Sequence, residues 1–138
     1  MFKNAPYRYT DFESLQIQYG TPDSMLNSYD SKTQNYQYLT NEDSLVKKKL
    51  KLTDNDLLYL HRKAMELGFW NVDDDMTTQR ADSLAGKHVP RFVLTYNYKE
   101  KQKKVVLDAD FEGNPKMKGA AKTTIDEVLR MINDANVR

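Results

Sequence analysis

Strict alternation of hydrophobic and polar residues marks the first third of the chain, and a period of two is typical of half-buried β-strands. In the first alternating segment Leu15, Ile17 and Tyr19 fall on one face. Turn-forming residues separate it from two further short segments that we expect to pair as a hairpin. The three segments are residues 13–19, 25–29 and 36–39.

Residues 46–52 alternate in the same way but carry Lys47, Lys49 and Lys51 on one face. Lysines in this arrangement suit a strand at the edge of a sheet, because their charge discourages pairing with another chain. The alternative is a phosphate-binding role, but no glycine-rich loop accompanies the lysines. We therefore predict a fourth strand near a solvent-exposed edge.

The clearest element is an amphipathic helix over residues 53–68. Thr53 and Asp56 have the spacing of a capping box, in which each side chain accepts a hydrogen bond from the other's backbone N–H. Leu52 and Leu57 are placed as a hydrophobic staple around it, and Gly68 can adopt the left-handed conformation that ends a helix. The buried face is predicted to carry Leu57, His61, Ala64 and Met65.

A second hairpin and a final helix follow. Residues 91–98 and 103–108 alternate as strands, and the four polar residues 99–102 form the predicted loop between them. Thr124 and Glu127 have the spacing to cap the final helix. Its predicted buried stripe consists of Ile125, Val128, Leu129 and Ile132.

This succession of elements predicts an α+β domain of order β-β-β-β-α-β-β-α. We expect an antiparallel sheet of about five to six strands, with the two helices packed on one face. Nothing in the 138 residues resembles a domain linker, so we predict a single domain over 1–138, with residues 1–11 as a flexible N-terminal segment.

Composition excludes several classes of function. The 21 basic and 20 acidic residues nearly cancel, so no long-range field favours nucleic acid as a partner. The chain has no cysteine, which removes disulfides, thiolate nucleophiles and iron–sulfur clusters. No segment has the roughly 18 apolar residues of a transmembrane helix, and residues 1–10 lack the features of a signal peptide.

The polar stretch over residues 71–90 is the first place to look for a site, because loops of this length are often functional. It contains three consecutive acids and one of the two histidines. A small metal-assisted or acid–base hydrolase is one hypothesis for this stretch, with two further acids that follow the second hairpin. Its residues would be Asp73, Asp74, Asp75, His88, Asp108 and Asp110.

Recognised motifs do not support that chemistry. Residues 108–113 begin like a calcium loop, but position nine is Lys116 and position twelve is Gly119 where a bidentate Glu is needed. His61 and His88 lie in no metal-ligand spacing, and no nucleophile turn is present. We therefore predict no catalytic residue, metal or cofactor, and a hydrogen-bonded core position for His61.

Nine tyrosines make the chain rich in this residue, and two i,i+2 pairs place their rings on one face of a strand. Tyrosine gives a binding surface large contact area with little side-chain entropy to lose. The alternative is that these rings pack within the sheet, because strands favour aromatic residues. The candidate binding face comprises Tyr36, Tyr38, Tyr96 and Tyr98 with Asp73, Asp74, Asp75 and His88 at its rim.

The layout of residues 13–135 resembles small secreted or lipoprotein α+β domains of unknown function from Bacteroidetes-type bacteria. The resemblance lies in Leu52-Thr53-Asp54-Asn55-Asp56-Leu57 opening a helix, Gly68-Phe69-Trp70 closing it, the acidic loop, the hairpin and the helix around Ile125-Asp126-Glu127-Val128-Leu129. Some relatives carry Cys-x-x-Cys-Pro where this chain has Gly20-Thr21-Pro22, so a redox or metal role is not carried over. The resemblance implies a periplasmic or cell-surface location, with the export signal outside this sequence.

Taken together, these patterns favour a non-enzymatic extracytoplasmic module. It would bind another protein or a cell-envelope component through a tyrosine-rich sheet face, and not nucleic acid. The alternatives are the hydrolase described above and a periplasmic inhibitor of another enzyme.

Overall fold

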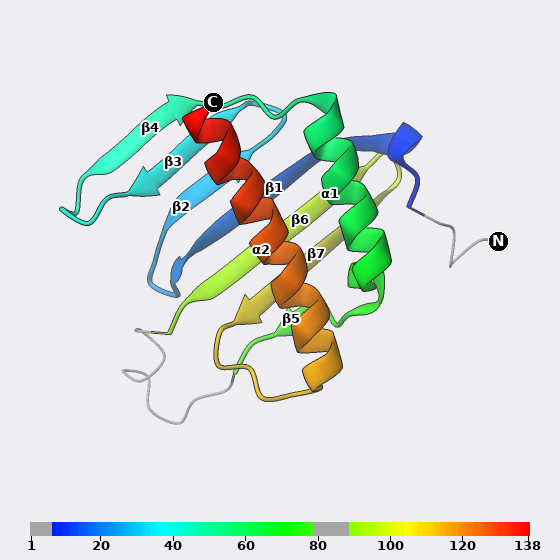
Figure 1. The fold of residues 1–138 in the computed structure, drawn as a ribbon. Helices are drawn as coiled ribbons and strands as arrows, with labels where there is room; N and C mark the ends of the chain where they lie inside the picture. Colours follow the sequence, from blue (N-terminus) through cyan, green and yellow to red (C-terminus); the bar gives the residue numbers. More distant parts are fainter. Residues whose placement is uncertain (1–6, 79–88) are drawn as a thin grey trace.

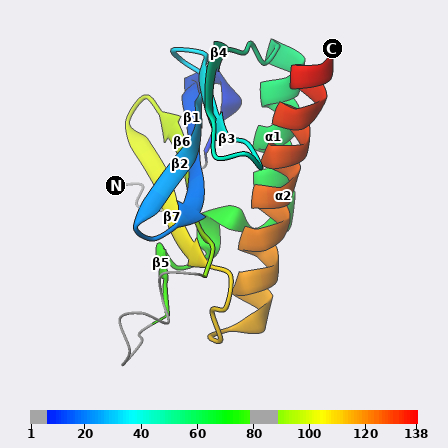
Figure 2. The same cartoon turned by 90° about the vertical axis from the view of Figure 1, so that its left-hand side faces the viewer.

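A sheet and a pair of helices form two layers in the computed structural model, which describes residues 7–78 and 89–138 (Figure 1, Figure 2). The strands are β1 (Phe12–Thr21), β2 (Ser24–Asp30), β3 (Asn35–Leu39), β4 (Leu45–Lys49), β5 (Asp75–Met76), β6 (Arg91–Tyr98) and β7 (Lys101–Asp108). The helices are α1 (Asp54–Leu67) and α2 (Pro115–Val137), with short 3-10 turns at Tyr9–Asp11 and Phe69–Asn71. Both helices lie on the same face of the sheet.

The sheet has seven strands in the order β4-β3-β2-β1-β6-β7-β5. All pairings are antiparallel except that of β5 with β7, where Asp75 lies beside Val106 and Met76 beside Leu107. The predicted α+β class is therefore confirmed. The expected count of five to six strands was too low because β5 has only two residues, too few to show a period.

The capping box of α1 is present as predicted. Thr53 Oγ1 accepts from the Asp56 N–H at 3.1 Å, and Asp56 Oδ2 accepts from the Thr53 N–H at 2.9 Å. Gly68 ends the helix with a φ of 79°. Leu60, His61 and Ala64 are buried, but Met65 is 52% exposed, so its assignment to the buried face was wrong.

The final helix begins earlier than predicted. Its cap is Asn114, whose side chain accepts from the N–H groups of Lys116 and Met117, and Pro115 occupies the first turn, where it costs no hydrogen bond. Thr124, the predicted cap, is buried within the helix and its hydroxyl donates to Ala120 O at 2.8 Å. The threonine can satisfy its hydroxyl inside the helix, which is why its presence did not mark a helix start.

Two strand ends also differ from the prediction. Tyr98 pairs directly with Lys101, so the second hairpin turns on two residues instead of four. At the edge of the sheet β4 stops at Lys49. Leu50 still donates its N–H to Gln34 O at 2.8 Å, and both Leu50 and Leu52 are buried in the core.

The core lies between the sheet and the helices. From the central strands it takes Leu15, Ile17, Leu94 and Val105, all at most 1% exposed. The helices close over them with Leu60, Ala64, Ile125, Val128 and Ile132. Each fully buried side chain of this size contributes about 1.5–3 kcal/mol relative to an exposed one.

The N-terminal residues that the structure describes pack against this core. Tyr7 stacks on Trp70 with ring centroids 4.2 Å apart, and Lys99 N–H donates to Asp11 O. Residues 7–11 of the expected flexible segment therefore contact the folded domain, whereas residues 1–6 lie outside the described part. Neither α1 nor α2, the helices of that part, is long and apolar enough to cross a membrane.

Replacing Thr53 with alanine is expected to lower the free energy of unfolding by about 1 kcal/mol, because the Asp56 N–H loses its acceptor. Urea unfolding followed by circular dichroism measures the change. Asn55→Ala is the matched control, since Asn55 is exposed and lies in the same helical turn. Equal stability of the two variants would contradict a cap at Thr53.

Candidate functional site

Two of the four tyrosines predicted to form a binding face belong to the core. Tyr96 is fully buried and Tyr98 is 4% exposed, and both lie under the helices. Tyr96 donates to Leu60 O at 3.0 Å, and the Tyr98 hydroxyl lies 2.7 Å from His61 Nδ1. Burial raises the pKa of both phenols. These two rings are therefore corrected from candidate binding residues to packing residues.

Tyr36 and Tyr38 lie on the same, helix-covered side of the sheet but farther from its centre. Both are half-buried, with ring centroids 5.0 Å apart. Tyr36 lines a hollow of about 240 Å³ between the sheet and α2, together with Tyr19 and Leu129. The predicted tyrosine face is thus reduced to a narrow aromatic strip beside α2.

The acidic triplet does not converge on one point. Asp73, Asp74 and Asp75 are all exposed. Asp74 pairs at 2.8 Å with Lys103, whose ammonium is held against the core by Val72 O. Hydrogen bonds from Thr77 lower the pKa of Asp75. His88 lies outside the described residues.

Asp108, which with Asp110 belongs to both the calcium-loop and the hydrolase hypotheses, is engaged in an ion pair. It is fully buried and accepts from Arg91 Nε at 2.6 Å and Arg91 Nη2 at 3.1 Å. The Thr78 N–H donates to the same carboxylate at 2.8 Å. Asp110 and Glu112 are exposed beyond the end of β7. Over residues 7–78 and 89–138 no three acids or histidines are grouped so as to hold a metal ion.

His61 occupies the core position predicted for it. It is 5% exposed and lies among the rings of Tyr9, Trp70 and Tyr98. Burial, helped by the neighbouring charge of Arg62, lowers the pKa of its imidazole. The histidine therefore favours its neutral form and serves packing.

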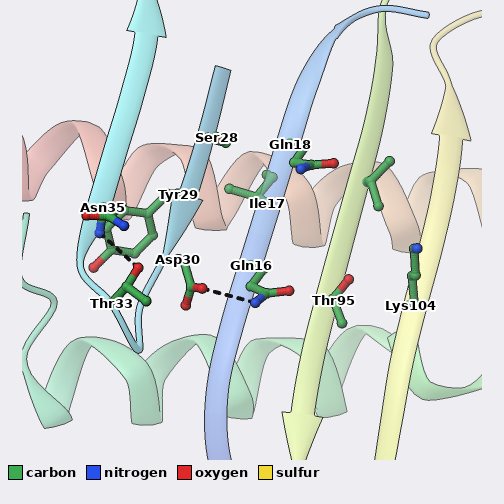
Figure 3. Close-up of a pocket in the computed structure, with 11 residues that line it drawn as sticks. Gln16, Ile17, Gln18, Ser28, Tyr29, Asp30, Thr33, Asn35, Thr95 and Lys104 are labelled. Carbon is green, nitrogen blue, oxygen red and sulfur yellow. Dashed lines mark hydrogen bonds between the residues drawn. The ribbon is translucent and has the colours of Figure 1, made fainter. Parts of the chain in front are cut away.

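An accessible polar surface lies on the face of the sheet that α1 and α2 leave uncovered, called here the helix-free face. Its centre holds a hollow of about 430 Å³ across β2, β1, β6 and β7 (Figure 3). Gln16 and Lys104 are exposed there, Asp30 is half-buried and Thr95 is 5% exposed. The other polar side chains that line the hollow are Gln18, Ser28, Thr33 and Asn35.

Strand register aligns four of these side chains in one row. Gln16 lies opposite Asp30 on one side and Thr95 on the other, and Thr95 lies opposite Lys104. Directly paired residues point to the same face, so the row Asp30, Gln16, Thr95, Lys104 crosses four strands. It is called here the polar row, and Figure 3 shows its members one after another across the sheet.

A second hollow of about 480 Å³ shares Gln16 and extends the same surface toward Asn97 and Gln102. The alternating pattern places Gln16 and Asn97 opposite the apolar residues of their strands, whereas Gln102 was expected in the loop between the strands, and none of them was predicted to form a site. The alternating pattern of each strand shows which polar residues share a face. It does not give the order of the strands, which decides which of these residues become neighbours.

Comparison with known proteins adds no assignment. No protein-family model matches the chain, and no curated protein shows significant sequence similarity to it.

Replacing Arg91 with leucine is expected to lower the free energy of unfolding by about 3 kcal/mol, because it leaves the buried Asp108 carboxylate without its cation. Chemical unfolding at neutral pH is the measurement. Lys122→Ala is the control, since it breaks an exposed i,i+4 pair with Asp126 and should cost at most about 0.5 kcal/mol. Similar losses in the two variants would show that burial of Asp108 does not matter.

Stability is expected to decrease as the pH falls from 7.5 to 5.5. Folding lowers the pKa of His61 from its ordinary value of 6.5, so the unfolded chain binds the proton more readily. The contribution is complete above about pH 6.5 and is lost as the pH falls toward the lower folded value. Urea midpoints measured across this range test the effect.

The slope should be absent in His61→Gln and retained in His88→Gln, which removes the other histidine of the sequence. A slope that persists in His61→Gln would assign the pH dependence to another group.

Proposed function

We propose that this protein is a non-enzymatic binding module whose helix-free face holds a polar ligand or partner. The observation that supports the proposal most directly is the 430 Å³ hollow on an uncovered sheet face, bordered by amide, hydroxyl, carboxylate and ammonium groups. Such groups offer both donors and acceptors to a ligand. A few convergent polar groups around a concavity are typical of binding sites.

The distribution of tyrosine supports this face over the one expected from the sequence. Tyr96 and Tyr98 are buried in the core, and Tyr36 lines the smaller hollow beside α2 with Tyr38 packed next to it. The helix-free face, by contrast, combines the larger hollow with exposed side chains such as Gln16, Gln18 and Lys104. A partner could reach these side chains without displacing a helix.

The position of the acidic residues favours binding over the hydrolase alternative. The Asp108 carboxylate forms an ion pair with Arg91 and accepts a hydrogen bond from the Thr78 N–H, and Asp74 forms an ion pair with Lys103. A general acid or base needs a proton-transfer geometry toward a substrate, and neither carboxylate lines the hollows of about 430, 240 and 480 Å³ described above. An extracytoplasmic location, with a protein or an envelope component as the partner, stays a prediction from the resemblance.

A ligand panel tested by NMR examines the proposal. We expect at least one ligand among uncapped tetrapeptides, end-capped tetrapeptides and N-acetylglucosamine oligosaccharides to shift the backbone amide signals of β1, β2, β6 and β7 in a saturable way. Gln16→Trp should weaken that binding by at least about tenfold, which is ~1.4 kcal/mol, because the indole fills the hollow.

Lys122→Trp places the same bulk on the exposed surface of α2 and should bind like the unmodified protein. The proposal fails if no member of the panel shifts these strands. It also fails if Gln16→Trp and Lys122→Trp bind equally well.

A further inference from the structure

We infer that the polar row binds a short peptide with uncapped ends, laid across the strands with its ammonium toward Asp30 and its carboxylate toward Lys104. This inference rests on the binding function proposed above and specifies the class of ligand. It starts from the two unlike charges that the strand register places at opposite ends of the row.

The length of the row matches about four residues. Neighbouring strands lie about 4.7–4.9 Å apart, so four strands span three intervals, or about 14 Å. An extended chain advances about 3.3–3.6 Å per residue, so a tetrapeptide covers a similar distance. The hollow of about 430 Å³ runs along this line (Figure 3).

The anionic end of the row is held in place by its neighbours. Asp30 Oδ2 accepts from Gln16 Nε2 at 3.1 Å, and Asp30 Oδ1 accepts from the Lys32 N–H at 2.9 Å. A carboxylate offers about four acceptor positions, so this group can still accept from a ligand ammonium. The cation of Lys49, near this end, is bonded to Thr33 O and Asn35 Oδ1.

The cationic end of the polar row is the Lys104 ammonium. Lys104 forms no hydrogen bond or ion pair with any residue that the structure describes. Its long side chain rises from β7 at the border of the hollow, where it can pair with a carboxylate. The two ends of the row therefore complement the two ends of a peptide zwitterion and fix its direction.

The centre of the row fits peptide groups. Gln16 presents an amide, which can donate and accept, and Thr95 presents a hydroxyl at the floor of the hollow. These groups recognise the backbone of a peptide independently of its side chains. Selection should therefore depend on the length of the peptide and on its charged ends.

NMR titration of the full chain with tetra-alanine, compared with its N-acetylated and C-amidated form, tests the inference. Uncapped tetra-alanine should bind at least about fivefold more tightly, because exposed ion pairs at two ends are each worth up to a few-fold in affinity. Asp30→Lys and Lys104→Glu should each weaken binding by about two- to fivefold.

The double variant Asp30→Lys/Lys104→Glu exchanges the two charges and should restore binding of the uncapped peptide, in the reversed direction. Glu42→Lys is the control for a change of charge, since Glu42 is exposed in the turn between β3 and β4. It should bind like the unmodified protein. Restoration in the double variant separates paired recognition from a general effect of net charge or folding.

Equal binding of capped and uncapped tetra-alanine would overturn the inference, as would a double variant no better than the single ones. If only an oligosaccharide shifts the helix-free face, and Gln16→Trp abolishes that shift, the peptide assignment is wrong and the binding function stands. If no ligand shifts this face, both are wrong.

Discussion

The antiparallel pairing of β1 with β6 is the constraint on which the rest of this molecule depends. It joins segments about eighty residues apart in sequence, from Phe12 beside Tyr98 to Gly20 beside Arg91. Every other strand is added outward from this pair, β2 to β4 on one side and β7 with β5 on the other. Closing so long a loop costs entropy, which the buried pairs Leu15–Tyr96 and Ile17–Leu94 must offset.

The same pairing separates the two sides of the molecule. Because side chains alternate along a strand, a register that buries Ile17 against Leu94 directs Gln16 and Thr95 to the opposite face. A shift by one residue would exchange the two sets and place amides under the helices. One strand register therefore determines both which residues form the core and which form the polar row, and a change of register would alter both sets.

Local patterns predicted the parts of the fold that local physics decides. The α+β class, the succession of long elements and both ends of α1 follow from period, capping and glycine chemistry around Thr53 and Gly68. Asn114 was overlooked because Thr124 and Glu127 have the spacing of a capping box, although Pro115 after Asn114 is itself a local signal of a helix start. The candidate site was less predictable. That Tyr96 and Tyr98 share a face was evident, but their burial depends on where α1 and α2 pack, and the polar row depends on strand order.

The Asp108 carboxylate binds the side chain of Arg91 and the backbone of Thr78, which lie thirteen residues apart in the sequence. One buried group thus fixes both ends of an intervening stretch of chain to the end of β7. Loss of the Asp108 carboxylate would therefore release the Arg91 side chain and the Thr78 backbone from the end of β7 together.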